Sequence, residues 1–171
     1  MVTAALPSQV EADDDLARAR AAAAAVLDPE VPVLTLADLG VLRDVFRRDG
    51  QIVVTLTPTY TGCPATAAIQ MAVETALLDA GLTTARVETV LSPPWTTDDL
   101  TEDGRRKLTA YGIAPPNRTV AAGLFAVETV ACPKCGSLQT VKISDFGSTA
   151  CKALWRCEAC REPFDYFKCH R

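Results

Sequence analysis

Two Cys-x-x-Cys units near the C-terminal end constrain the fold of this chain more than any other feature. The first spans Cys132 to Cys135 and the second spans Cys157 to Cys160, with 21 residues between them. Two residues between cysteines allow both sulfurs to face one ion, and four thiolates in a tetrahedral arrangement suit Zn²⁺. The intervening segment is long enough for a hairpin that returns the second pair to the first. We therefore predict one structural Zn²⁺ held by Cys132, Cys135, Cys157 and Cys160.

The segment between the two cysteine pairs supports this metal site. Stretches 139–143 and 153–156 have the β-propensity that a zinc ribbon requires. Four thiolates on Zn²⁺ leave a local charge of about −2. Basic side chains are placed to offset this charge: Lys134, Lys152, Arg156, Arg161 and Lys168. An iron–sulfur cluster on the same four cysteines is the competing interpretation, and structural zinc is the one that we adopt.

Cysteine usage and charge divide the chain into two regions. Six of the seven cysteines fall between Cys132 and Cys169, and Cys63 lies outside. Residues 132–171 carry seven Lys/Arg against four Asp/Glu, a formal +3, so the remainder is −7 in a chain whose total is −4. An acidic body is poorly suited to grip a nucleic-acid backbone. With 171 residues, the chain has room for a small domain and an appended module.

The N-terminal segment lacks the features of a secretory signal. Acidic residues at positions 11, 13, 14 and 15 precede an alanine run, where a signal would place positive charge. No apolar run approaches the length needed to cross a bilayer. We expect a cytoplasmic protein that does not associate with membranes. In that reducing compartment, cysteines favour metal or thiol chemistry over disulfides.

Hydrophobic periodicity predicts a small α/β domain over residues 15–100, after a disordered N-terminus over residues 1–14. An amphipathic helix is expected over 15–27, and Asp49-Gly50 predicts a hairpin turn. The remaining elements would form a three-stranded sheet with packed helices: strands at 41–47, 51–57 and 86–91, and a helix at 64–80.

Residues 101–130 are expected to be a helix and a linker ahead of a β-rich zinc ribbon over residues 131–171. The polar helix is predicted over 98–111, with Thr96 or Thr97 as its cap. Gly112 would close this helix, and the Pro-Pro-Asn sequence that follows it has the composition of a linker.

Cys63 is a candidate functional thiol. Proline is favoured at the first position of a helix, so Pro64 would place Cys63 at or near the N-cap. Unpaired backbone amides and the helix dipole favour a thiolate there, able to bind a soft metal or accept sulfur. Thr57, Thr59 and Thr61 add hydroxyls around the same loop. A passive role as a helix cap is the alternative interpretation.

Cys151 is the second candidate thiol. It lies in a loop of small residues beside Lys152, a cation that can lower a thiol pKa. A buried small hydrophobe in a module with little core is an equally valid interpretation. Cys169 and His170 are a further candidate ligand pair, which we do not favour because a histidine so close to the chain end is usually solvated.

The sequence lacks the groups needed for independent catalysis. His170 is the single histidine and is far from Cys63 along the chain, so a Cys–His dyad is unsupported. A phosphate-binding glycine loop, a Rossmann fingerprint and a nucleophile elbow are all missing. Asp28, Glu30 and Asp38 are the candidates for carboxylate chemistry, and turn or cap formation accounts for them.

The N-terminal motifs resemble those of the iron–sulfur assembly-associated domain, which occurs in SufT-like cluster maturation factors. The resemblance covers about residues 15–100 and implies a small α/β domain in which Cys63 is the functional thiol. Asp28, Glu30 and Asp38 would shape its surroundings, with Thr57 and Thr61 beside it. In chain order, the motifs are Asp28-Pro-Glu-Val-Pro32, Asp38-Leu-Gly40, Thr57-Pro-Thr-Tyr-Thr-Gly-Cys-Pro64 and Pro93-Pro-Trp95.

The C-terminal motifs are similar to those of D subunits of the phenylacetyl-CoA epoxidase system, and with them the similarity spans nearly the whole chain. In that family the epoxidation belongs to a separate di-iron oxygenase and a reductase with flavin and a 2Fe–2S cluster. The resemblance implies a non-catalytic maturation subunit in aerobic phenylacetate degradation. Oxygenase or reductase subunits would be its partners, and an iron–sulfur cluster its transient cargo. The motifs lie at 132–137, 144–152 and 162–169.

Two other functions are compatible with the sequence. The ribbon could dock the oxygenase or reductase while the cysteines never meet iron. A zinc-ribbon nucleic-acid binder is the third hypothesis, against which the acidic body and the lack of basic residues interleaved with aromatics argue. The oligomeric state is left open, with a homodimer among the options.

Overall fold

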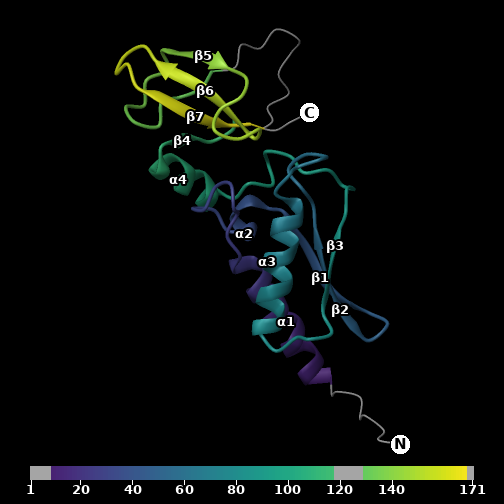
Figure 1. Ribbon diagram of the computed structural model, residues 1–171. Coiled ribbons are helices and arrows are strands. Elements are labelled where there is room, and N and C mark those ends of the chain that lie inside the picture. Colours follow the sequence, from purple (N-terminus) through teal and green to yellow (C-terminus); the bar gives the residue numbers. More distant parts are fainter. Residues whose placement is uncertain (1–8, 118–128, 169–171) are drawn as a thin grey trace, which may run out of the picture.

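The computed structural model describes residues 9–117 and 129–168 and contains two sheets (Figure 1). The first has three strands in the order β1-β2-β3, and the second has four in the order β4-β7-β6-β5. The second sheet lies beyond α4, at one end of the helix-covered first sheet (Figure 1). The mixed α/β fold class expected from the sequence, a three-stranded sheet with packed helices followed by a β-rich module, is confirmed.

The N-terminal sheet forms around a tight hairpin and one crossover. β1 (Leu42–Arg48) and β2 (Gln51–Leu56) pair antiparallel. Asp49 and Gly50 join them with φ angles of 53° and 79°, which is the backbone that an Asp-Gly hairpin turn supplies. β3 (Arg86–Thr89) then pairs parallel with β2, so the chain must cross the sheet between them.

Helix α3 (Thr66–Asp79) makes this crossover, and α1 (Gln9–Ala25) packs beside it (Figure 1). Both helices bury small or aliphatic side chains against the sheet. Ala19, Ala23, Val73 and Leu77 are at most 1% exposed. Alanine allows α1 to approach its neighbours closely, so part of the alanine run belongs to the core.

Three boundaries differ from the predictions. α1 begins at Gln9, inside the segment expected to be disordered, and residues 1–8 lie outside the described part. α4 (Glu102–Tyr111) is capped by Thr101, whose hydroxyl accepts from the amide of Gly104, so the predicted cap at Thr96 or Thr97 is wrong. Thr96 instead donates to Asp99 in a turn that precedes the helix. α3 begins at Thr66 rather than at residue 64.

The C-terminal sheet includes two strands that the sequence analysis missed. β5 (Thr140–Ser144) and β6 (Lys152–Cys157) match the predicted β stretches, and β7 (Pro163–Phe167) extends the antiparallel sheet. β4 (Ile113–Ala114) pairs parallel with β7. This short strand lies in the segment expected to be helix and linker. Its two residues carry no periodic signal, and only pairing with β7 makes them a strand.

The two modules share buried side chains. Cys151 and Phe167 come from the C-terminal module, yet both belong to the hydrophobic core of the N-terminal domain. The ring of Phe167 packs edge-on against Trp95, with centroids 6.2 Å apart. Trp95 is itself held by a hydrogen bond of 2.8 Å from its indole nitrogen to the carbonyl of Leu39. The C-terminal module is therefore docked on the first domain through apolar contacts.

The motif Asp38-Leu-Gly40 forms α2 (Leu36–Leu39) and its tight C-terminal end. Gly40 has φ of 72°, and a Cβ there would lie 2.2 Å from the carbonyl oxygen of Asp99. A larger residue would have to displace that backbone, so glycine is required by both conformation and space. This close approach brings the segment before α4 against α2.

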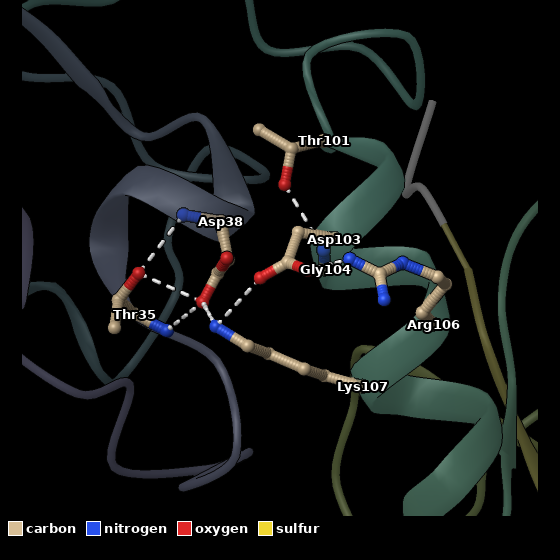
Figure 2. Close-up of polar contacts among 7 residues, drawn as sticks. All are labelled: Thr35, Asp38, Thr101, Asp103, Gly104, Arg106 and Lys107. Atoms are coloured by element: carbon tan, nitrogen blue, oxygen red, sulfur yellow. Dashed lines mark hydrogen bonds and ion pairs between the residues drawn. The ribbon is translucent and has the colours of Figure 1, made fainter.

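Asp38 ties α2 to α4 (Figure 2). Its carboxylate accepts hydrogen bonds from the amide and the hydroxyl of Thr35 at 2.9 and 2.8 Å. The Asp38 amide in turn donates to the hydroxyl oxygen of Thr35 at 3.0 Å, which caps the helix. The same carboxylate lies 2.7 Å from the ammonium of Lys107 on α4. Lys107 and the Thr35 hydrogen bonds lower the pKa of Asp38 despite the opposing effect of burial.

We expect Asp38→Asn to lower the free energy of unfolding by about 2 kcal/mol near pH 7, because hydrogen bonds to a buried charged group are lost. The folded-state pKa of Asp38 is depressed, so the stabilisation is present above the unfolded pKa and disappears as the pH falls through the folded pKa. Urea unfolding should therefore show the two proteins converging below about pH 4.

Asp103→Asn is the matched control, because Asp103 pairs with the same lysine at 3.1 Å from a half-exposed position. It should change stability far less. Equal losses for both variants at every pH would contradict the structural role of Asp38.

Candidate functional site

Four cysteines of the C-terminal module converge on one point. Cys132 and Cys135 lie in the turn before β5, Cys157 ends β6, and Cys160 lies in the turn before β7. Their four sulfurs all lie within 4.8 Å of one another. The Sγ–Sγ distances are 3.8 Å for Cys132–Cys160 and 3.6 Å for Cys135–Cys157. Tetrahedral zinc with Zn–S bonds of about 2.3 Å places sulfurs about 3.8 Å apart, so the set fits the ion.

The backbone around the sulfurs also favours thiolates. The amide of Cys160, 3.5 Å from the sulfur of Cys157, is the largest of several contacts that lower the pKa of Cys157 to about 6. The Ser137 backbone lowers the pKa of Cys135 in the same way, but the neighbouring thiols and burial outweigh it and raise that pKa to about 12. Gly136, with φ of 74°, closes the first turn by donating to the carbonyl of Cys132 at 2.9 Å. These four residues would hold Zn²⁺. A bound zinc would supply a cross-link between two turns and no reaction, because four cysteines fill its coordination.

A second cluster of functional side chains surrounds a cavity of about 30 Å³ between the two modules. The N-terminal domain supplies Cys63, two acidic residues and several threonines, and the C-terminal module supplies Cys151 and Phe167. Most of the remaining wall is aliphatic. The polar and sulfur-bearing residues that line the cavity are Asp28, Glu30, Thr57, Thr59, Cys63, Thr66, Thr89 and Cys151.

Cys151 and Glu30 meet in this cavity although 121 residues separate them. The Cys151 sulfur donates to a Glu30 carboxylate oxygen at 3.1 Å, and the hydroxyl of Thr149 lies 3.0 Å from the same sulfur. Burial raises the pKa of Cys151 to about 12, and Glu30 adds to the rise. Lys152 does lower this pKa, as the sequence predicted, but its effect is smaller than that of burial. Cys151 is therefore a neutral thiol hydrogen-bonded to a carboxylate at pH 7.

Asp28 positions Glu30. One oxygen of its carboxylate accepts from the amide of Glu30 at 2.9 Å and from the amide of Val31 at 2.7 Å. Such an Asx turn is the local role that short acidic side chains favour before a proline-rich stretch. Burial raises the pKa of Asp28, while the two amides oppose the rise. Asp28 thus shapes the loop that presents the Glu30 carboxylate to the cavity.

Cys63 lies at the mouth of α3 but does not cap it. The N-cap is Ala65, and Cys63 lies two residues earlier in a turn closed by the Thr66 amide at 3.1 Å from the Cys63 carbonyl. The expectation that Pro64 begins the helix is wrong, because Pro64 occupies this preceding turn. Cys63 is half-buried. Burial and the adjacent Cys63 raise the pKa of Tyr60 to about 12, so a protonated phenol stands beside the thiol.

Apart from the four zinc ligands, the structure brings five of the predicted site residues to one cavity and leaves two away from it. Asp38 does not line the cavity, because its carboxylate is engaged by Thr35 and Lys107. Thr61 is exposed and borders a separate hollow beside Trp95. Cys169 and His170 lie outside the described residues. The five residues at the cavity are Asp28, Glu30, Thr57, Cys63 and Cys151.

Sequence reasoning missed three residues around the cavity: Thr149, Tyr60 and Phe167. Each lies inside a motif quoted above, yet none has an unusual composition or spacing that marks it. Thr149 and Tyr60 could have been found from their closeness in sequence to Cys151 and Cys63, respectively. Phe167 offered none, because its burial depends on the docking of β7 against the N-terminal domain.

Among the residues that the structure describes, no helix has the length and apolar character of a membrane span.

Two family models match consecutive parts of the chain. "Iron-sulfur cluster assembly protein" matches residues 16–91, which contain Glu30 and Cys63. "PaaD zinc beta ribbon domain" matches residues 117–168, which contain Cys151 and the four converging cysteines. The cavity is therefore built from both matched segments.

One curated relative spans both segments. A protein of Escherichia coli (strain K12), named for the D subunit of 1,2-phenylacetyl-CoA epoxidase, is 51% identical over 142 residues. The match covers 83% of this chain and 86% of the relative.

Solved structures match the N-terminal part. A domain of unknown function, DUF59, from Bacillus anthracis is 26% identical with a TM-score of 0.51, covering 56% of this chain and 92% of that one. Rv1466 from Mycobacterium tuberculosis, described as associated with Fe–S complex assembly and repair, is 35% identical over 63% of this chain and 96% of that one. Its TM-score is 0.33, so the comparison of folds depends on the DUF59 domain.

We expect metal removal to unfold the C-terminal module. Its own buried cluster is small and includes two of the ligand cysteines, so the cross-link is needed to hold it together. Treatment with a strong chelator under reducing conditions should abolish the near-ultraviolet signal of Trp155, which packs edge-on against Tyr166 with centroids 5.9 Å apart. Re-addition of one Zn²⁺ per chain should restore it.

Cys160→Ser should reproduce the chelated state, whereas Ser137→Ala, just after the turn that holds Cys132 and Cys135, should not. A module whose fold and thermal stability survive chelation would contradict a structural metal.

Proposed function

The chain belongs to the family of the D subunits of 1,2-phenylacetyl-CoA epoxidase, and on this basis we propose that it is an accessory protein that helps to assemble an iron–sulfur or di-iron centre of that system. In this proposal it works in the cytoplasm and contacts the oxygenase or the reductase. Cys63 handles the metal or sulfur cargo, with Glu30 beside it. The four-cysteine site holds structural zinc and takes no part in the transfer.

The observation that carries this proposal is the meeting of two thiols and a carboxylate in one cavity. Cys63 comes from the segment that matches the iron–sulfur assembly family, and Cys151 comes from the ribbon. Thiols and carboxylates are the ligands through which proteins bind and exchange iron. The two thiols and the carboxylate lie at the junction between two modules, where Cys151 is buried and Cys63 is only half-buried, so a partner would reach the cargo from the side of Cys63.

The proposal includes no independent turnover. Sites for drug-sized ligands occupy about 300–1,000 Å³, and a coenzyme A thioester needs at least that. The cavity is about 30 Å³. Epoxidation of phenylacetyl-CoA is therefore assigned to the partner subunits, and this chain contributes to making them competent.

Cys63→Ser tests the maturation role in cells that express the complete epoxidase system. We expect less iron and sulfide in the purified reductase, less iron in the oxygenase, and lower epoxidase activity, with unchanged amounts of each protein. Iron, sulfide and activity are measured relative to the amount of each protein. Glu74→Gln, on the exposed face of α3, is the control that should leave all three unchanged. Unaltered metal content in Cys63→Ser would refute the role of this thiol.

A structural docking role is the second candidate, favoured by exposed apolar side chains in the edge strand β5 and in the segments just before and after it. Leu138, Val141, Ile143 and Phe146 are 63%, 42%, 51% and 62% exposed. If docking is the whole function, co-purification with the other epoxidase proteins should survive Cys63→Ser and disappear when residues 131–171 are removed, while metal content per oxygenase stays normal in Cys63→Ser.

The structure also bears on the nucleic-acid hypothesis. Basic residues of the ribbon are paired with its own acidic residues: Lys134 with Glu162 at 2.7 Å, and Arg156 and Arg161 with Glu158 at 2.7 and 3.2 Å. Cations engaged in this way are poorly placed to release counterions from phosphates. We therefore do not favour a nucleic-acid partner.

A further inference from the structure

The geometry points to a second metal site, in which Cys63, Cys151 and Glu30 bind one divalent transition-metal ion reversibly in the cavity between the two modules. This inference rests on the proposed function, because it names the form of the cargo: a single ion rather than an assembled cluster. It also assigns a ligand role to a residue of the ribbon, so that both modules are needed to hold the ion.

The donor set suits a thiophilic divalent ion such as Fe²⁺. Two sulfurs and a carboxylate combine soft and hard ligands, which favours iron, cobalt or zinc over magnesium or calcium. The Cys151 sulfur is already within 3.1 Å of the Glu30 carboxylate. Each thiol that binds the ion releases one proton to solvent, and the ion does not change its oxidation state. The buried ammonium of Lys152, 3.3 Å from the Glu30 carbonyl, offsets part of the negative charge of these ligands.

The size of the cavity decides between an ion and a cluster. A space of about 30 Å³ holds roughly two water molecules, since each needs about 10–15 Å³ on this measure. One metal ion with a water ligand fits in that space. An iron–sulfur cluster brings at least two irons and two sulfides, which would require the modules to separate.

Thr57 provides an independent sign that the cavity accepts a polar guest. Its side chain is 1% exposed and lines the cavity. The hydroxyl oxygen is buried and has no hydrogen-bond partner among the described residues. Leaving a buried hydroxyl unpaired is unfavourable, and an ion or its water ligand in the cavity would satisfy it.

The same residues explain why binding here would be reversible. In the described part of the chain, the ribbon cysteines form the one group of three or more His, Cys, Asp or Glu donors gathered within 4.8 Å. The donors of the cavity are not gathered to this degree, so a metal must draw them together. Structural sites are closed and preformed, whereas a site that must rearrange binds more weakly and exchanges its ion.

Cobalt binding to the zinc-loaded full-length protein tests this inference. One Zn²⁺ per chain is bound first, and it stays in the ribbon because zinc outcompetes cobalt for thiolates. Co²⁺ is then titrated without oxygen, with a thiol-free reductant present. We expect one Co²⁺ per chain beyond the zinc, with thiolate-to-cobalt charge-transfer absorption, and Fe²⁺ should compete for the site.

Matched variants identify the ligands. Cys63→Ser, Cys151→Ser and Glu30→Gln should each weaken Co²⁺ binding by at least about tenfold, the lower limit for disturbing a metal site. Glu74→Gln should bind as the wild type does. Thr57→Val should weaken binding without lowering the melting temperature of the protein whose cavity is metal-free, since its hydroxyl has no partner to lose. If Cys151→Ser does not fold, Cys63→Ser and Glu30→Gln still decide the question.

A zinc-loaded wild type that takes up no cobalt, or uptake that Cys63→Ser and Glu30→Gln leave unchanged, would overturn the site. If Cys63→Ser also lowers the metal content of the epoxidase in cells, the maturation role stands and only the single-ion site is lost. If cobalt binding requires Cys63, the site is supported. If Cys63→Ser at the same time leaves the metal content of the epoxidase normal in cells, the maturation role is refuted and the site stands.

Discussion

The convergence of four cysteine sulfurs on one point holds the C-terminal module together. The cavity depends on this module, because Cys151 and Phe167 form part of its wall. The module buries few side chains of its own, and Cys132 and Cys157 are among them. Once the sheet is formed, it places Phe167 and Cys151 in the core of the N-terminal domain. Cys151 can reach Glu30 only from a folded module. The cross-link within the C-terminal module therefore determines whether the thiol and the carboxylate meet at the junction of the two modules.

A second set of contacts supports the same junction from the N-terminal side. The carboxylate of Asp38 bridges α2 and α4, and Gly40 lets the segment before α4 approach closely. α4 leads directly into β4, the strand that pairs with β7 of the ribbon. Asp38 was expected near the functional thiol, but its carboxylate has a structural role instead. It joins α2 to α4, the helix that leads into the ribbon, and does not line the cavity itself.

Local signals account for the parts of the fold that were predicted well. The Asp-Gly turn marked the first hairpin, and the two-residue spacing within each Cys-x-x-Cys unit marked the metal ligands, because both signals depend on neighbours a few residues apart. Predictions failed where a distant contact decides the local structure. β4 exists only through its pairing with β7. The cap of α4 was misassigned for a local reason instead, because a turn between Thr96 and Asp99 precedes the helix that Thr101 caps.

The sequence by itself determined which residues can bind metal and which family the motifs resemble, because ligand spacing and turn chemistry are encoded within short segments. It left Cys151 equally open to a thiol role and to passive burial, and it grouped Asp38 with Asp28 and Glu30. Only the tertiary structure separated these cases. It set Cys151 against Glu30, 121 residues away along the chain, and turned Asp38 toward Lys107. Contacts at that separation arise from the packing of whole modules, which no local pattern records.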